Sequence, residues 1–206
     1  MNYYISRETA CISRDNKQRS TPHILGRRFA LTSTAYKYLD IRIVVGPVSA
    51  VEIILGDTRG NALLLPHSTW TTLIQKREDI EQHVQSAPSP TSLTICDLVL
   101  TVVTMRGMNL VQMKLYDACM YMKPSTLLFL FELEQCVEHA YSWLCQNTHY
   151  VSEKYKQFVT ILKRNSIAHK HEAVKILREY YDKNSPADCE LLTFAVDNML
   201  YDAINN

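Results

Sequence analysis

The stretch LLLPHSTWTTLIQKREDIEQHVQ, residues 63–85, sets an apolar strand pattern directly before a helix pattern, with a proline between them. Proline has no backbone N–H to donate to a sheet, so the strand is expected to end at Pro66. The apolar positions after it fall on one narrow stripe of a helix. They are Trp70, Leu73, Ile80 and Val84, and Arg77 interrupts them. Such a helix either packs on its own sheet or also pairs with a second helix, and a charge within the stripe favours pairing.

Three segments before this helix have strand patterns, and the first of them alternates around β-branched residues. They are residues 37–46, 49–57 and 61–66. Gly46 and Pro47 break the chain after the first segment, and the turn chemistry of DTRG, residues 57–60, favours a hairpin after the second. Residues 27–86 are therefore predicted to form one unit of three strands and a helix.

The same order of elements returns later in the chain. Strand patterns at residues 93–107, 108–117 and 118–124 precede a helix pattern at 125–146. Placing Trp70 on Leu127 also places Leu73 on Leu130, Arg77 on Glu134 and Ile80 on Val137. If the two helices run antiparallel, Arg77 and Glu134 meet in the middle of the seam, where such a pair specifies pairing more than it stabilises it. The repeat predicts an internal duplication, with residues 92–146 as the second unit and with the helices at 68–85 and 126–145 packed together.

The strand and helix around Pro66 resemble those of the positive cofactor four family of transcriptional coactivators, which bind single-stranded DNA. The helix positions that carry the resemblance are Trp70, Leu73, Asp79, Ile80 and Val84, with one residue inserted after Pro66 relative to the family spacing. The resemblance covers residues 27–146. Each family subunit is a curved sheet with one helix, and two subunits pair through their helices. The resemblance therefore implies an α+β fold in which the two units of this chain form an intramolecular pseudo-dimer.

The resemblance also implies positions that hold single-stranded bases and backbone, at the turn after the first strand and at the end of the second. In the first unit this turn, VVGPVSA at residues 44–50, has neither an aromatic nor a lysine. In the second unit, Met105 falls on an aromatic position and Arg106 on a lysine position of the family. Lys114 and Tyr116 fall near the end of the second strand. Cations neutralise phosphates and aromatics stack on bases, so these residues are predicted to bind nucleic acid. The alternative is that Tyr116 is half-buried sheet surface and Arg106 a solvated turn residue.

The regions around the two units are basic. Residues 1–37 contain seven Lys/Arg and two acids, and residues 154–183 contain eight and three, although the net charge of the chain is only +1. Such zones favour an anionic partner but are also typical of solvated tails and faces. Residues 1–26 are predicted to be a basic arm that either contacts the phosphates of a nucleic acid or keeps the chain soluble. Residues 151–206 are predicted to be a helical segment, with helices at 152–165, 167–183 and 186–204.

Other classes of protein find little support in the sequence. No apolar run is long enough to span a membrane, and the N-terminus has no apolar core of a secretory signal. The six cysteines form no CxxC pair, which favours a reduced, intracellular protein of the nucleus or the cytoplasm. GDTRG is followed by no GK[ST], and neither G-x-S-x-G nor H-E-x-x-H occurs, so we expect no enzyme, no metal site and no cofactor.

The sequence thus predicts a non-enzymatic protein that binds single-stranded DNA or RNA in transcription or replication. Proteins of those processes are further expected partners, a membrane is not, and the oligomeric state is left open. The two basic zones favour this function. The alternative is a protein–protein interaction scaffold that keeps the fold but has lost nucleic-acid binding, and the turn at residues 44–50 favours that alternative.

Overall fold

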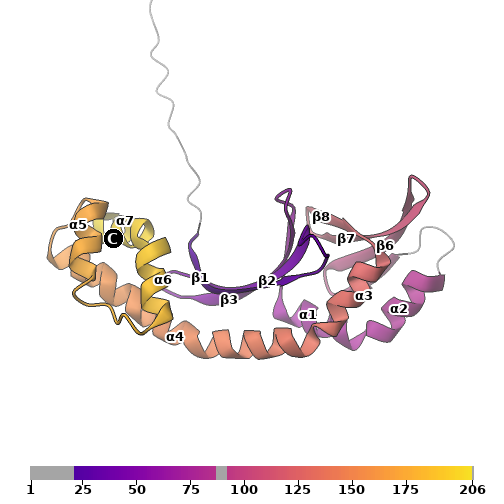
Figure 1. The fold of residues 1–206 in the computed structure, drawn as a ribbon, viewed down its shortest axis with the longest axis horizontal. Helices are drawn as coiled ribbons and strands as arrows, with labels where there is room; N and C mark the ends of the chain where they lie inside the picture. Colours follow the sequence, from indigo (N-terminus) through magenta and orange to yellow (C-terminus); the bar gives the residue numbers. More distant parts are fainter. Residues whose placement is uncertain (1–20, 87–91, 206) are drawn as a thin grey trace, which may run out of the picture.

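The computed structural model describes residues 21–86 and 92–205 and shows an α+β fold with two four-stranded antiparallel sheets (Figure 1). The first sheet, in the order β1-β2-β3-β4, consists of β1 His23–Ala30, β2 Lys37–Val44, β3 Ala50–Asp57 and β4 Ala62–Leu65. The second, in the order β5-β6-β7-β8, consists of β5 Ser92–Ile95, β6 Leu98–Met105, β7 Met108–Leu115 and β8 Ala118–Met122. The helices are α1 His67–Gln75, α2 Arg77–Ser86, α3 Pro124–Glu132, α4 Glu134–Arg164, α5 Lys170–Leu177, α6 Pro186–Phe194 and α7 Val196–Asn205. The predicted mixture of two sheets, each followed by helices, is confirmed.

Each unit has four strands, so the predicted three were one too few. In the first unit β1 begins at His23, inside the predicted arm of residues 1–26, and the rest of that arm up to residue 20 lies outside the described chain. In the second unit the expected strand at residues 93–107 is two strands, β5 and β6, joined by a turn at Cys96. Cys96 has a positive φ of 51°, a conformation more typical of Gly or Asn. Asp97, the other residue of the turn, is a common turn residue, but it stands alone within an apolar stretch.

The helices also differ from their predicted lengths. The helix expected at residues 68–85 is interrupted at Lys76, and the one expected at 125–146 is interrupted at Leu133. Beyond that break α4 continues without interruption to Arg164, so the predicted boundary between residues 146 and 151 lies inside a helix. No Gly or Pro stands there. The polar side chains of Asn147 and Thr148 bond back to carbonyls of the same helix instead of ending it.

The C-terminal helices are also shorter than predicted. The helix expected at residues 167–183 is reduced to α5, and the one expected at 186–204 is divided at Ala195 into α6 and α7. Ser185 caps α6 by accepting a hydrogen bond from the backbone N–H of Asp188, and Pro186 occupies the first helical turn as expected.

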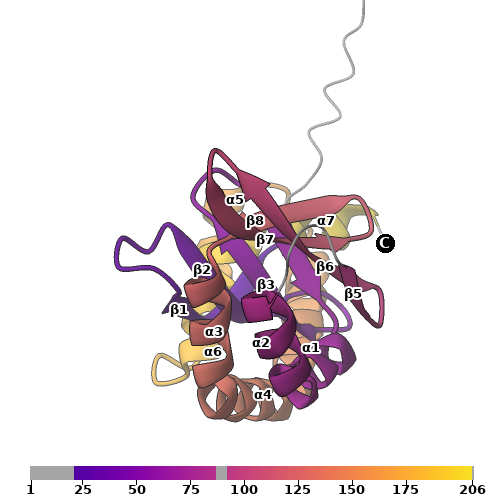
Figure 2. The same cartoon turned by 90° about the vertical axis from the view of Figure 1, so that its right-hand side faces the viewer.

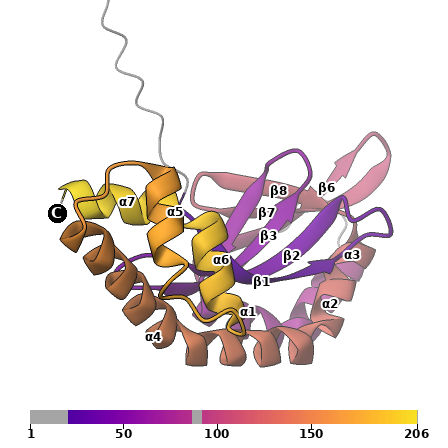
Figure 3. The ribbon, with the colours of Figure 1, turned by 60° about the vertical axis from the view of Figure 1, so that its left-hand side comes forward.

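The first sheet forms a curved layer in the middle of the molecule. Its lower face is apolar: Leu39, Ile41 and Ile43 of β2 are almost completely buried, and α4 packs beneath β2 and β3. Asp40 and Arg42 alternate with them on the upper face. Figure 1 shows the second sheet rising at one end of this layer and α5–α7 at the other. Figure 3 shows α6 beside β1, whose outer edge it partly covers.

The helices of the two units pack against each other below the sheets (Figure 2). Trp70 of α1 donates its indole N–H to the carboxylate of Glu138 in α4 at 2.9 Å, and Arg77 of α2 pairs with Glu132 of α3 at 2.6 Å. From Trp70 to Arg77 the partner moves back along the sequence from Glu138 to Glu132, so the helices run antiparallel. Arg77 also pairs with Glu81 of its own helix at 2.7 Å, and its partner across the seam is Glu132 and not the predicted Glu134, which lies in the first turn of α4.

The apolar stripes of both helices lie in the core. Of the residues predicted to pair the helices, Trp70, Leu73, Ile80, Leu127, Leu130 and Val137 are all fully buried. Trp70 and Leu130 are thus buried as the stripe predicts. Whether the two units are related as a symmetric pseudo-dimer stays a prediction.

Candidate nucleic-acid interface

The predicted nucleic-acid residues lie at two separate ends of the β6–β7 hairpin. Met105 and Arg106 are at its tip, where Met105 pairs with Met108 and Arg106 has a positive φ of 52°. Lys114 is near the other end of β7, and Tyr116 is in the turn that follows. The eight residues of β7 separate the two groups by about 25 Å, at the usual rise of a strand. The structure therefore brings Lys114 and Tyr116 together but not Arg106.

Tyr116 projects from its turn with 65% of its surface exposed, so the alternative of half-buried sheet surface does not hold. Its hydroxyl donates to the carboxylate of Asp97 at 2.8 Å, and this hydrogen bond to a negative group raises the pKa of Tyr116. The ring also borders a cleft of about 270 Å³ between the two units, which Leu64, His67 and Tyr141 also line. The exposed part of this ring is available for contact with a ligand.

Lys114 lies on the open face of the second sheet. It pairs with Val99 on one side and with Cys119 on the other, and it has no ion-pair partner within residues 21–86 and 92–205. The next position on this face is Gln112, whose amide donates to the hydroxyl of Tyr121 at 2.9 Å. The face thus carries a free cation beside an aromatic ring, and Tyr121 is 41% exposed.

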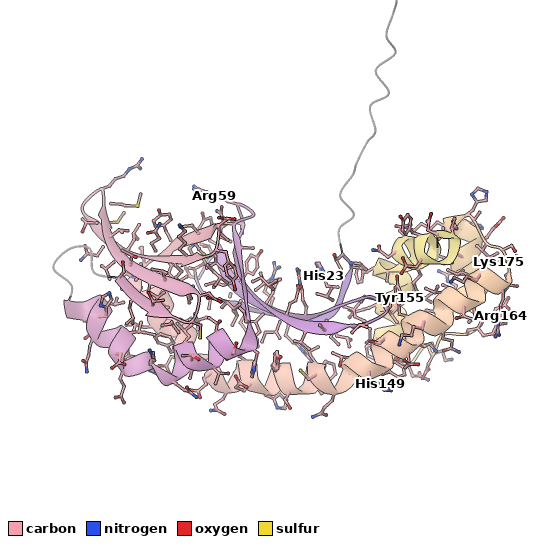
Figure 4. The ribbon with its side chains drawn as sticks, turned by 180° about the vertical axis from the view of Figure 1, so that it is seen from behind. His23, Arg59, His149, Tyr155, Arg164 and Lys175 are labelled. Atoms are coloured by element: carbon pink, nitrogen blue, oxygen red, sulfur yellow. The ribbon has the colours of Figure 1, made fainter. Side chains whose placement is uncertain are left out.

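The edges of the two sheets meet along β4 and β8, and a groove of about 290 Å³ lies at one end of this contact. We call it the intersheet groove. It is lined by Tyr36, Lys37, Asp57, Arg59, Asn61, Cys119, Met120 and Tyr121. Figure 4 shows Arg59 at the tip of its hairpin on the upper side of the molecule. Sequence reasoning missed this site because its residues come from three separate segments, residues 36–37, 57–61 and 119–121, that only the fold brings together.

Asp57 is the one carboxylate that lines the groove, and its oxygens already have hydrogen-bond and ion-pair partners. Asp57 accepts hydrogen bonds from the backbone N–H groups of Arg59 and Asn61 and from the Asn61 side chain, and it lies 3.5 Å from the Lys37 ammonium. Burial by itself would raise the pKa of Asp57, but these hydrogen bonds and the positive charge of Lys37 hold it below its usual value. Burial also lowers the pKa of Lys37, against the attraction of Asp57.

Arg59 is left as the free cation of the intersheet groove. Its guanidinium lies 5.8 Å from the ring centroid of Tyr36 and has no carboxylate partner among the described residues. Tyr121 of β8 also lines the groove. A guanidinium in a groove that two tyrosines also line can contact a phosphate while the rings stack on bases.

The first sheet offers a different surface. Arg28 binds Asp40 through two hydrogen bonds of 2.6 and 2.7 Å, and Arg42 faces Glu52 at 3.7 Å, so the charges on its upper face are largely paired. The turn at residues 44–50 is tied to the long helix, because the backbone N–H of Ser49 donates to the hydroxyl of Ser152 at 2.9 Å. On the upper face the named cations are paired with carboxylates, in contrast to Lys114 on the open face of the second sheet.

The basic zone near the C-terminus is also partly neutralised. Lys154 pairs with buried Asp188 at 2.9 Å, Lys156 with Glu153, and Lys170 with Asp197. Figure 4 shows Arg164 and Lys175 at the end of the molecule opposite Arg59. The zone is therefore not one continuous basic face with the intersheet groove.

Within the described parts of the chain, no group of three or more His, Cys, Asp or Glu side chains could hold a metal ion, and no helix is long and apolar enough to cross a membrane. Comparison of the chain with protein-family models, with curated proteins and with solved structures gives no match.

Proposed function

We propose that this chain binds single-stranded nucleic acid without catalysing a reaction, in the setting of transcription or replication. The observation that carries the proposal is the intersheet groove, which the free cation Arg59 lines together with Tyr36 and Tyr121. Aromatic faces for bases and cations for phosphates are the two requirements of single-strand binding. The resemblance to the positive cofactor four family supports the same function and suggests the setting.

A strand held in the groove can continue over the open face of the second sheet. Tyr121 borders both surfaces, and Lys114 follows one position further along that face. A duplex does not fit this chemistry, because its base faces are stacked on each other and are not accessible to tyrosine rings. The proposal therefore concerns single strands or locally melted duplexes.

The test is the binding of a fluorescein-labelled single strand, followed by anisotropy at several salt concentrations. Arg59→Gln removes one phosphate contact, so the slope of log K against log salt is expected to flatten by about 0.7. Tyr36→Ala removes a stacking ring and is expected to cost about 1–3 kcal/mol of binding with little change in that slope.

The matched control is Arg164→Gln, which removes an exposed cation at the opposite end of the molecule. It is expected to leave affinity and slope nearly unchanged. If Arg164→Gln weakens binding while Arg59→Gln and Tyr36→Ala bind normally, the groove is not the nucleic-acid surface.

A second candidate function is an interaction scaffold, and the first sheet favours it. The named charges on its upper face are ion-paired, and its turn at residues 44–50 is hydrogen-bonded to α4, so neither this face nor this turn presents a free cation to nucleic acid. Absence of binding to any single strand at low salt, with the fold intact by circular dichroism, would favour the scaffold.

A further inference from the structure

A cleft of about 430 Å³ opens on the helix side of the first sheet, between β1 and the first half of α4. We call it the α4 cleft. Its lining side chains are Arg27, Phe29, Cys136, His139, Ala140 and Trp143. Its volume is in the range of small-ligand sites. Because Arg27 and Phe29 project from the lower side of the sheet, the cleft is separate from the intersheet groove.

The position of Arg27 in this cleft depends on an irregularity of β1. Ile24 pairs with Ile43, but after a bulge Arg27 pairs with Ile41, so the register has shifted by one residue. Without the shift Arg27 would lie opposite Asp40 on the upper face, where its neighbour Arg28 lies. Bulges re-aim side chains and are frequent beside functional sites.

The bulge is held in place by the C-terminal helices. Leu25 adopts a positive φ of 56°, and its backbone N–H donates to the carboxylate of Glu190 in α6 at 2.6 Å. A bulky non-glycine residue rarely adopts this conformation, which is energetically unfavourable. The fold thus maintains a strained backbone whose effect is to turn an arginine toward the helix side of the sheet.

The cleft combines an aromatic surface with side-chain nitrogens that have no hydrogen-bond or ion-pair partner among the described residues. Trp143 is 38% exposed, and the Arg27 guanidinium lies 5.7 Å from its ring centroid. No carboxylate lines the cleft, and neither Arg27 nor His139 has a hydrogen-bond or ion-pair partner in residues 21–86 and 92–205. A ligand that matches these groups has a flat ring and a negative charge.

We infer that the α4 cleft binds a nucleobase together with its phosphate. The base stacks on Trp143 beside Phe29. The phosphate oxygens accept hydrogen bonds from the forked N–H groups of Arg27, which match a phosphate better than a lysine ammonium does. His139 at the rim supplies a further donor. The site goes beyond the proposed function, since it takes a single nucleotide, either free or at the end of a strand, on the side away from the intersheet groove.

The experiment is titration of the full chain with AMP, adenosine and inorganic phosphate by calorimetry and tryptophan fluorescence. The chain has two tryptophans, and Trp70 is buried in the helix seam, so Trp143 reports on the cleft. We expect AMP to quench the emission saturably. Trp143→Phe is expected to remove the quenching but keep most of the calorimetric affinity, and Trp143→Ala to weaken binding at least about tenfold.

The neighbouring arginines provide a matched pair of variants. Arg27→Gln is expected to weaken AMP about tenfold and leave adenosine unchanged, whereas Arg28→Gln, on the upper face, is expected to leave AMP binding unchanged. A single strand with a 5′-phosphate that competes with AMP more strongly than the same strand without it identifies a strand end as the ligand. Equal competition by both strands identifies a free nucleotide.

The inference is overturned if AMP does not bind at millimolar concentration, or if Arg27→Gln and Trp143→Ala both bind it normally. It is also overturned if an acidic peptide with an aromatic residue binds in place of AMP and is lost in the same variants. Loss of AMP binding in Arg59→Gln alone would place the nucleotide in the intersheet groove. That result would support the proposed function and reject the α4 cleft.

Discussion

Removal of the Trp70 side chain tests how much the helix seam contributes to stability. Trp70 is fully buried between the units, and its indole N–H donates to Glu138 at 2.9 Å. Trp70→Ala leaves a large cavity among side chains that are held in place by both sheets, so we expect a loss of about 4 kcal/mol in the free energy of unfolding. Domains of this kind are stable by only about 5–15 kcal/mol, so the variant should be close to unfolding.

Trp70→Phe separates packing from hydrogen bonding. It keeps an aromatic ring in the core but leaves the Glu138 carboxylate without the indole N–H. Because the Glu138 side chain is 42% exposed, water can replace that donor, and we expect the lost hydrogen bond to contribute only about 1 kcal/mol. With the smaller ring, the total cost should be about 1–2 kcal/mol.

The assay is urea unfolding followed by far-ultraviolet circular dichroism, with the midpoint and the m-value fitted for each variant. A double-mutant cycle of Trp70→Phe with Glu138→Gln should give a coupling of about 1 kcal/mol. A loss under about 1 kcal/mol for Trp70→Ala would refute the buried seam. A coupling of zero would show that the hydrogen bond contributes nothing.

Three further outcomes are expected. The pKa of Asp57 is lower in the folded than in the unfolded chain, so its contribution to stability is present above pH 4 and is lost as the pH falls through the folded pKa; Asp57→Asn should reduce the acid-induced loss of stability seen in urea titrations at pH 2–5. Arg106→Ala with Lys114→Ala should flatten the salt slope of single-strand binding by roughly 1.4, and an unchanged slope would exclude both as phosphate contacts. Asp188→Ala leaves Lys154 without its buried partner and should cost about 3–5 kcal/mol in denaturant, whereas a loss below 1 kcal/mol would show that the pair is hydrated.

Local chemistry predicted the parts of the fold that depend on neighbouring residues. Pro66 ends β4, and the stripe from Trp70 to Val84 becomes the buried side of α1 and α2, because both features follow from one short segment. The turn of Cys96 and Asp97 was missed, although Asp is common in turns. Cys96 makes a turn through a positive φ, and nothing in its residue type distinguishes it from a strand position.

The candidate sites were less predictable because distant segments form them. Arg59 was visible only as part of a turn, and its two tyrosines come from the β1–β2 turn and from β8 in the other unit. Arg27 was visible only as a basic residue. Its place in the α4 cleft depends on a bulge that Glu190, far along the chain, helps to hold.

The continuity of α4 also limits how the molecule can move. Its 31 residues form a helix of about 46 Å, which passes beneath the first sheet and reaches from the seam of the two units to α5–α7. A hinge between residues 146 and 151 would require breaking this helix and releasing Ser49 from Ser152. The continuous α4 therefore fixes the distance between the two ends of the protein. A ligand or partner that contacts both ends must match this distance.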